Sequence, residues 1–454
     1  MAIETITDRG TWNTKLGFIL AAAGSAVGLG NIWRFPTEAA ANGGAAFLII
    51  YLICVFLVGF PVMIAELSIG RSSKKNPVGA FRALSSNKFF PLVGMWGVLC
   101  GVMVLSFYAV VAGWTFSHVF VEFFVYSGLD SMATLFADVS NGYINAIFAI
   151  LFMICTIAIL TGGVSDGIER ATKFMMPMLI IILLVMTVYA LFQPGAQEGL
   201  MVYLKPDFSK ITGNLILAAM GQAFFSLSLG MGALITYGSY LSKKENIPEA
   251  AAYVTFADVG IAFLAGLLVI PTMYIAQAQG VEIFGPDGEL LAGTALIFQL
   301  LPELFSQMGG LIGLLFGVSF FLLLSIAALT SSISLLEVPV SYAIDEFGIR
   351  RKNAVLAIGS GVLVLSMIIS FYLGLIDLID FTFSVIGLPL GGLFICLFIG
   401  YVWKTDNALE EMKHGYKSIA NSFFSVLWPL FVKIICPIII LIILIYNFIQ
   451  FFNG

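Results

Sequence analysis

The chain has 454 residues, of which 60% are hydrophobic and only 10% are charged, and its formal net charge is −5. Soluble domains carry about 25% charged residues, so this composition excludes an ordinary soluble domain. Apolar runs of about 20 residues recur along the chain, as a hydrocarbon layer requires, and they are continuous rather than alternating, which excludes a β-barrel. The sequence therefore predicts an all-α polytopic membrane protein.

Hydropathy predicts about 11 transmembrane helices. The first is too long, and too soon followed by further spans, to be a cleavable signal peptide. Several are longer than a straight helix needs to cross one bilayer, so we expect tilts or kinks. In chain order the predicted spans are 14–39, 44–70, 91–126, 144–161, 168–192, 213–241, 250–279, 309–345, 353–373, 376–403 and 423–452.

The basic residues lie mostly on one side of this topology. If the N-terminus is cytoplasmic, every Lys and Arg falls on the cytoplasmic side except Arg34, Lys205, Lys210 and Lys433. The positive-inside rule therefore predicts a cytoplasmic N-terminus and, with an odd number of spans, an extracytoplasmic C-terminus. The short termini indicate an integral protein of the plasma membrane, in bacteria the inner membrane.

Two spans are interrupted by small and polar residues. The stretch GSAVGLGN (24–31) lies in the first span and FSLSLGMG (225–232) in the sixth. Glycine costs about 1 kcal/mol in a helix interior relative to Ala, and unwound backbone within a membrane is tolerated only where it lines a buried site. The alternative is close helix packing through small residues. The matching positions of the breaks favour two repeats, 1–192 and 213–403, followed by one more span, 423–452.

Broken helices offer two kinds of binding group. A half-helix that begins near Gly28 presents free N–H groups and the positive end of a dipole, which suit a carboxylate. A half-helix that ends near Phe225 leaves free carbonyl groups, which suit an ammonium group or Na⁺. A zwitterionic amino acid with Na⁺ beside it fits both ends.

Four motifs carry a closer resemblance. In chain order they are GSAVGLGNIWRFP, NGGAAF, GQAFFSLSLGMGALITYGSY and ALTSS. In this order they resemble the neurotransmitter:sodium symporters, particularly the bacterial amino-acid transporters, and the resemblance covers essentially the whole chain. It implies a leucine-transporter-like fold of five plus five inverted repeats with helices 1 and 6 unwound. It also implies sodium-coupled symport of a neutral, hydrophobic or aromatic L-amino acid by alternating access.

The resemblance implies two sodium sites. The first would use Ala26, Asn31, Ser226 and an oxygen of the substrate carboxylate, so that ion and substrate are ligands of one another. The second would use the carbonyl groups of Gly24, Val27 and Ala327 and the hydroxyl groups of Thr330 and Ser331. Neutral oxygen ligands suit a monovalent ion better than Ca²⁺. The alternative for the two hydroxyl groups is a bond back to their own helix.

For the substrate, the resemblance implies that the Tyr108 hydroxyl holds the carboxylate. Leu29 and Gly30 would donate from their N–H groups, and Phe225 and Ser226 would present carbonyls to the amine. Gly28 replaces the Asp that monoamine carriers of the family have, which favours an amino acid over an amine. The full predicted substrate set is Ala26, Leu29, Gly30, Val104, Tyr108, Phe225, Ser226, Ser228, Met231, Ser331 and Leu335.

The resemblance also implies two gates and a helical segment that unwinds. Arg34 and Asp380 match the extracellular gate, and a partner for Arg34 is expected because an unpaired Arg in a membrane is costly. Gly167 and Pro177 resemble a helix-5 element that unwinds to admit water to the second sodium site. The cytoplasmic gate matches Arg9, Trp12, Tyr240 and Asp345.

The chain departs from the family near the first sodium site. Asp258, the only acid in the predicted seventh span, stands at or beside a position where the family has an Asn. Chloride-dependent relatives bind Cl⁻ near the positions of Tyr51, Gln222 and Ser226, whereas bacterial members use a fixed carboxylate. We expect Asp258 to be that carboxylate, or to ligate Na⁺ directly, so that no chloride is required. An Asp without an ion role is the alternative.

Two other function classes are alternatives to a symporter. An intramembrane enzyme is disfavoured, because the 5 Cys and 2 His of the chain form no metal cluster and no nucleophile–base arrangement stands out, so no catalytic residue is expected. A transporter-like receptor or channel remains the alternative to a symporter. The expected partners are an amino acid, two Na⁺ ions and the lipid bilayer, without nucleic acid or an obligate protein partner.

Overall fold

The computed structural model describes residues 10–278, 280–283, 293 and 296–453. Throughout these residues the regular structure is helical, in agreement with the predicted all-α class. Besides α-helices, the chain forms π-helical turns and the short 3₁₀ turns η4 and η8. The first part contains α1 (Lys15–Ala26), η1 (Gly30–Arg34), α2 (Phe35–Ala41), α3 (Ala45–Cys54), η2 (Val55–Gly59), α4 (Phe60–Ser73), α5 (Pro77–Leu84), α6 (Phe90–Tyr126), α7 (Asp130–Ala137), α8 (Gly142–Thr161), η3 (Val164–Glu169), α9 (Arg170–Leu191) and α10 (Ala196–Leu204).

The second part of the chain continues in the same manner. It contains η4 (Phe208–Lys210), α11 (Gly213–Ser226), α12 (Ala233–Ser239), α13 (Ile247–Ala278), η5 (Leu296–Leu300), α15 (Leu301–Met308), α16 (Gly310–Phe347), α17 (Arg351–Phe371), α18 (Gly374–Ile379), η6 (Asp380–Ile386), α19 (Gly387–Leu397), η7 (Phe398–Val402), α20 (Thr405–Lys413), η8 (Ile419–Asn421), α21 (Phe424–Leu430), η9 (Phe431–Ile435) and α22 (Cys436–Asn453).

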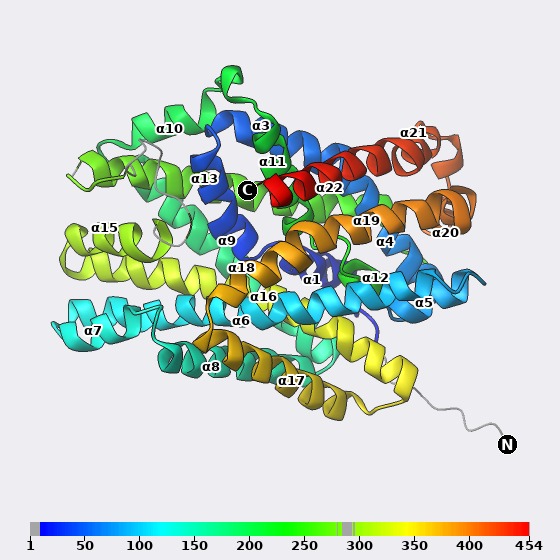
Figure 1. Ribbon diagram of the computed structural model, residues 1–454, viewed down its shortest axis with the longest axis horizontal. Helices are drawn as coiled ribbons and strands as arrows, with labels where there is room; N and C mark the ends of the chain where they lie inside the picture. Colours follow the sequence, from blue (N-terminus) through cyan, green and yellow to red (C-terminus); the bar gives the residue numbers. More distant parts are fainter. Residues whose placement is uncertain (1–9, 279, 284–292, 294–295, 454) are drawn as a thin grey trace.

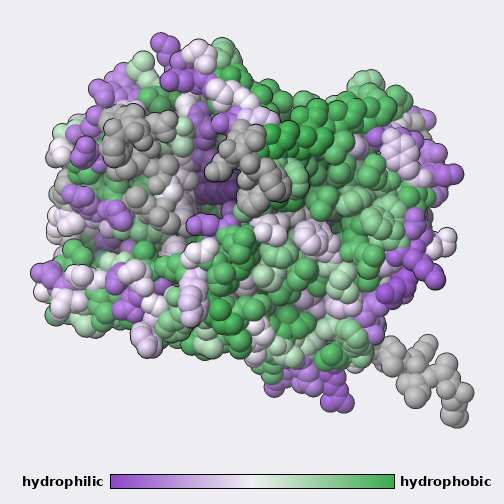
Figure 2. Space-filling model, viewed as in Figure 1, coloured by the Kyte–Doolittle hydropathy of each residue, from purple (hydrophilic) through white to green (hydrophobic). Residues whose placement is uncertain are grey.

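The long helices run side by side along the horizontal axis of Figure 1, so that short helices and loops gather at two ends. Helices α7 and α15 lie at the left end, and α5 and α20 lie at the right end. We call these the α7–α15 end and the α5–α20 end. Figure 2 shows an apolar surface that is broad over α21 and α22, as expected where lipid surrounds a bundle.

Nine helices in the described part of the chain are long and apolar enough to cross a membrane, or ten if α1 and the bent segment after it form one span. The predicted sixth span, 213–241, consists of α11 and α12, which have 14 and 7 residues. Each is too short to cross a bilayer alone. The multi-span membrane fold is therefore confirmed, and the count of 11 spans stays a prediction.

Both predicted breaks are present and lie inside the bundle. Helix α1 ends at Ala26, and the chain resumes a helical path at Gly30 with a bend of 53°. Helix α11 ends at Ser226, and α12 begins at Ala233. Between them the backbone has positive φ angles at Ser228, Gly230 and Gly232, a conformation that glycine adopts without strain. Gly230 and Gly232 thus allow the turn that interrupts the sixth predicted span.

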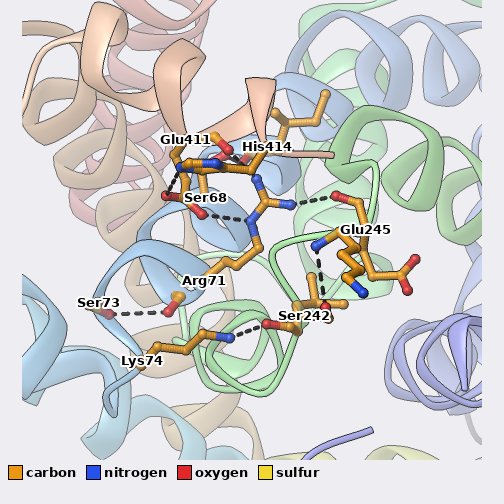
Figure 3. Close-up of polar contacts among 12 residues, drawn as sticks. Ser68, Arg71, Ser73, Lys74, Ser242, Glu245, Glu411 and His414 are labelled. Carbon is orange, nitrogen blue, oxygen red and sulfur yellow. Dashed lines mark hydrogen bonds and ion pairs between the residues drawn. The ribbon is translucent and has the colours of Figure 1, made fainter. Parts of the chain in front are cut away.

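At the α5–α20 end, the last turn of α4 is tied to two other segments (Figure 3). The Arg71 side chain is fully buried, and its Nε donates to Glu411 of α20 at 2.8 Å. Its remaining nitrogen atoms donate to the backbone carbonyls of Glu245 and Glu411, and Lys74 donates to the carbonyl of Leu241. This network fixes α4 against the α12–α13 connection and α20 and, with it, the frame around the broken helices.

Candidate functional site

The break in the first span faces the middle of α16. The Thr330 hydroxyl donates to the Val27 carbonyl at 3.2 Å and to the Ala327 carbonyl of its own helix at 2.9 Å. The Ser331 hydroxyl lies 3.4 Å from the Val27 carbonyl oxygen and 3.5 Å from that of Gly24. The five predicted oxygen atoms of the second sodium site are therefore close together. Neutral oxygen atoms alone form this set, which fits a monovalent hard cation.

Asp258 lies at the centre of a buried polar cluster on the other side of the break. The Ser226 hydroxyl donates to its Oδ1 at 2.7 Å, and the Asn31 amide donates to the same oxygen at 2.7 Å. The Tyr51 hydroxyl donates to Oδ2 at 3.1 Å. Asp258 is fully buried, and no ion pair to it is found among the described residues. A buried carboxyl group surrounded by neutral donors needs a proton or a cation.

The cluster includes the positions at which the family resemblance implies chloride binding in chloride-dependent relatives. Tyr51 and Ser226 both contact the Asp258 carboxylate, and the amide of the fully buried Gln222 donates to the Gly30 carbonyl at 2.5 Å. The Asp258 carboxyl group thus lies between Tyr51 and Ser226. Of the predicted first-site residues, Asn31, Ser226 and Asp258 are in direct contact, whereas Ala26 contributes to the adjoining pocket.

A small pocket lies between the two breaks. The Tyr108 hydroxyl accepts a hydrogen bond from the Leu29 N–H at 3.2 Å, which points this phenol at the N-terminus of the second half-helix. Of the predicted substrate residues, Leu29 and Ser226 are outside the lining of this pocket, and Ser25 and Gly28 are additional lining residues. The predicted residues that line it are Ala26, Gly30, Val104, Tyr108, Phe225, Ser228, Met231, Ser331 and Leu335.

Only glycine fits at position 28, because two neighbouring side chains approach its backbone closely. A Cβ atom at this position would overlap the Ser331 hydroxyl and lie 2.9 Å from the Tyr108 hydroxyl. The backbone N–H of Gly28 donates to the Asn31 side-chain oxygen at 3.0 Å. Any side chain at position 28 would therefore occupy the space between the sodium-site hydroxyls and the phenol.

A larger cavity of about 620 Å³ adjoins the pocket and contains the predicted extracellular gate. Arg34 Nη1 lies 3.7 Å from Asp380 Oδ1, so the structure brings this pair together. The Arg34 guanidinium also lies over the Phe225 ring, 4.9 Å from its centroid, within range of a cation–π contact. Phe225 lines both cavities, so its ring lies on the route between them.

At the opposite side of the pocket, part of the predicted cytoplasmic gate is packed together. The Trp12 indole donates to the Tyr237 carbonyl at 3.2 Å, and its ring lies 6.1 Å from that of Tyr240. Asp345 accepts from the backbone and side chain of Asn76. Arg9 lies outside the described residues.

Two acids that were not predicted from the sequence support the predicted cytoplasmic gate and the second break. The Tyr240 hydroxyl donates to Glu337 at 2.6 Å, and Glu337 forms an ion pair with Arg351 at 2.6 Å. Glu66 Oε1 accepts from the Gly230 N–H at 2.7 Å and so supports the second break. Both acids are fully buried. Their signal in the sequence was an isolated carboxylate within an apolar span, which is costly and therefore usually functional.

The predicted helix-5 element is helical in this structure. Gly167 belongs to the π-helical turn η3, and Pro177 lies inside α9. The whole segment Val164–Leu191 remains long and apolar enough to span a membrane. Unwinding between Gly167 and Pro177 therefore stays a prediction.

Comparison with known proteins agrees with this geometry. The model of the family described as "Sodium:neurotransmitter symporter family" matches residues 9–128 and 121–453. An uncharacterized sodium-dependent transporter of Bacillus subtilis is 35% identical, with 95% of this chain and 96% of the relative covered. Another from Haemophilus influenzae is 33% identical, with 97% and 98% covered.

A solved structure, that of MhsT in complex with L-phenylalanine, is also similar. It is 40% identical in sequence, has a TM-score of 0.85 and covers 97% of this chain and 100% of its own. The human sodium- and chloride-dependent GABA transporter 2 is a more distant relative, 25% identical over 82% of this chain. The predicted fold class is therefore confirmed, and the family consists of sodium-coupled membrane transporters rather than enzymes.

Proposed function

The chain belongs to the sodium:neurotransmitter symporter family, and from this premise we propose that it carries a neutral L-amino acid with a hydrophobic or aromatic side chain together with Na⁺. The apolar lining by Val104, Met231 and Leu335 supports this substrate class, because flexible Met adapts to different apolar shapes. The similar structure that contains L-phenylalanine supports it as well.

The observation that carries the proposal is the contact of Tyr108 with the first break. Its hydroxyl and the Leu29 N–H, 3.2 Å apart, form a pair of groups at a helix N-terminus inside a membrane. Such a pair suits a carboxylate, and the carbonyls at the end of α11 suit an ammonium group. An amino acid would then lie between the two breaks, with its side chain toward Val104 and Leu335.

Two Na⁺ ions would accompany it. One would be held by Ala26, Asn31 and Ser226 together with the substrate carboxylate, and the other by Gly24, Val27, Ala327, Thr330 and Ser331. The substrate carboxylate would be shared with the first ion, so binding of either partner strengthens binding of the other. Sodium supplies positive charge at these oxygen atoms, and the chain's own residues set their positions.

The Asp258 carboxylate would replace chloride. Its oxygen atoms lie 2.7 Å from the Ser226 hydroxyl and 3.1 Å from the Tyr51 hydroxyl, so the charge that balances the first Na⁺ is covalently fixed. Transport would then need no chloride. Arg34 with Asp380, and Trp12 with Tyr240 and the remaining residues of the predicted cytoplasmic gate, would close the two sides alternately.

The purified protein in proteoliposomes tests this function. Uptake of each common amino acid is measured with an inward gradient of Na⁺ or of K⁺, with chloride or gluconate outside. We expect saturable, uphill uptake of apolar amino acids that requires Na⁺ and is the same in both anions. Dissipative flux without accumulation would indicate a channel, and binding without flux would indicate a receptor.

A further inference from the structure

Two buried titratable side chains play no part in the mechanism above. His118 and Glu122 lie on α6 toward the α7–α15 end, and they are 1% and 4% exposed. They are four positions apart, so they share one face of the helix. His118 Nε2 and Glu122 Oε1 are both buried without a hydrogen-bond partner among the described residues. Unpartnered ionisable groups at this depth are costly, which points to a ligand.

The molecule provides space for the Glu122 carboxyl group. A Cβ atom at Gly317 of α16 would overlap the Glu122 side chain, so a glycine is needed opposite this acid. Glu122 also lines a cavity of about 240 Å³ with Tyr126, Ser306 and the glycines at the start of α16. Glu122 therefore reaches from the helix interface to a polar cavity.

The chemistry of the pair identifies the ligand. His118 Nδ1 lies 2.8 Å from the Trp114 carbonyl oxygen. A carbonyl oxygen can only accept a hydrogen bond, so Nδ1 carries the hydrogen atom. The neutral ring then has its lone pair on Nε2. A proton on the Glu122 carboxyl group removes the uncompensated charge that burial would otherwise impose at this position.

The pair is connected to the large cavity through one ring. Phe298 of η5 lies 4.7 Å from the His118 ring, and it also contacts Trp33 at 5.6 Å and Trp114 at 5.9 Å. Trp33 and Trp114 line the same cavity as Arg34. A change at His118 therefore acts directly on the segment packed beside the gate.

We propose that His118 and Glu122 form a proton-binding site, separate from the Asp258 cluster, that controls how η5 packs over the Arg34 cavity. With the proton bound to Glu122, both side chains are neutral, and Phe298 and Phe321 pack on the His118 ring at 4.7 and 4.9 Å. Acid therefore holds η5 in place and closes the cavity. Loss of the proton leaves a buried negative charge on Glu122. Water that enters to hydrate this charge loosens the packing of η5 and opens the cavity.

Few other titratable groups lie near this face in the described residues. On α6 itself Tyr126 lines the cavity. Glu303 of α15 and Asp130 and Asp138 at the ends of α7 are exposed to solvent. Helix α8, η5 and the adjoining half of α16 contribute no charged residue. The exposed Glu303 therefore serves as a matched control.

Infrared spectroscopy of the purified protein tests the site without relying on transport. We expect a protonated carboxyl band that titrates between about pH 5 and about pH 8. This band should be absent from Glu122→Gln, shifted in His118→Gln and unchanged in Glu303→Gln. Gly317→Ala, which crowds the carboxyl group, should shift the same band and provides a second variant if Glu122→Gln does not fold. A titrating band that all of these variants retain unchanged would overturn the proposal.

The proposed control of η5 is tested by measuring the rate of amino-acid uptake at different external pH values, with the internal pH held constant. The wild-type rate should rise about fivefold, a modest coupling between two sites, from external pH of about 6 to about 8. Glu122→Gln and His118→Gln should abolish this rise, and Glu303→Gln should keep it. An equal rise in all four proteins would overturn the control. Absence of uptake would contradict the proposed function, while the infrared result would still decide the site.

Discussion

Asp258 is the residue on which the expected independence of chloride rests. Its carboxylate is fully buried and accepts hydrogen bonds from Asn31, Tyr51 and Ser226. The resemblance to the family predicted this acid near the first sodium site, at or beside a position where the family has an Asn. The contacts with three partners on separate helices could not be predicted, because they depend on how α3, α11 and α13 pack.

Replacing Asp258 by Asn tests its charge. Asp258→Asn keeps the shape and removes the fixed negative charge, so uptake in chloride-free buffer should fall at least about tenfold, or about 1.4 kcal/mol. Added chloride should restore part of it, because an anion can then enter beside Tyr51 and Gln222. Undiminished, chloride-independent uptake by the variant would refute the role of Asp258.

Thr330 tests the second sodium site. Thr330→Val keeps the side-chain volume and removes a hydroxyl group that lies 3.2 Å from the Val27 carbonyl. The Na⁺ concentration for half-maximal uptake should rise about tenfold, since a hydrogen-bonding or ligating group next to a charge contributes roughly 1.5–3 kcal/mol. Ser332→Ala, whose hydroxyl contacts Leu329 and Thr156, is the control. An unchanged sodium dependence in Thr330→Val would exclude this ligand.

At the scale of elements, the two broken helices were predictable and their surroundings were not. Glycine-rich stretches predicted both interruptions, and the breaks lie at 27–29 and 227–232. Hydropathy could not reveal that the sixth span becomes two helices of 14 and 7 residues. The acids Glu66 and Glu337 were overlooked, because their partners Gly230 and Tyr240 are far away in sequence.

Gly28 tests whether the first break forms the substrate site. The methyl group of Gly28→Ala would overlap the Ser331 hydroxyl and crowd Tyr108, so the amino-acid dissociation constant should rise about tenfold or more. Gly221→Ala on α11 is the matched control, because nothing lies within 4 Å of an added Cβ there. Equal binding by both variants, measured by titration calorimetry, would place the substrate elsewhere.

At the scale of the whole molecule, the residues of the two predicted gates lie on either side of the pocket. Arg34 and Asp380 come from elements almost 350 positions apart in the sequence, and only the resemblance to a family could pair them before the structure did. The repeat boundaries at 1–192 and 213–403, and the orientation of the termini, stay predictions. The repeat boundaries depend on the symmetry of the fold, and the orientation of the termini depends on the membrane. Composition indicates that a membrane is present but does not define its position.

Arg34→Ala tests the gate. Loss of the guanidinium removes its contacts with Asp380 and with the Phe225 ring, so transport should fall several-fold while sodium-dependent binding persists. Lys205→Ala, which removes an exposed cation after α10, should leave both unchanged. Uptake by Arg34→Ala that equals wild type at every substrate concentration would argue against gating.

The most direct test of joint binding at the two breaks is an equilibrium measurement. Binding of the preferred amino acid to the purified protein is followed while Na⁺ replaces K⁺ at constant ionic strength. The dissociation constant should fall about tenfold or more, and the amino acid should raise the affinity for Na⁺ by the same factor. An amino-acid affinity that is identical in Na⁺ and in K⁺ would contradict joint binding at these breaks.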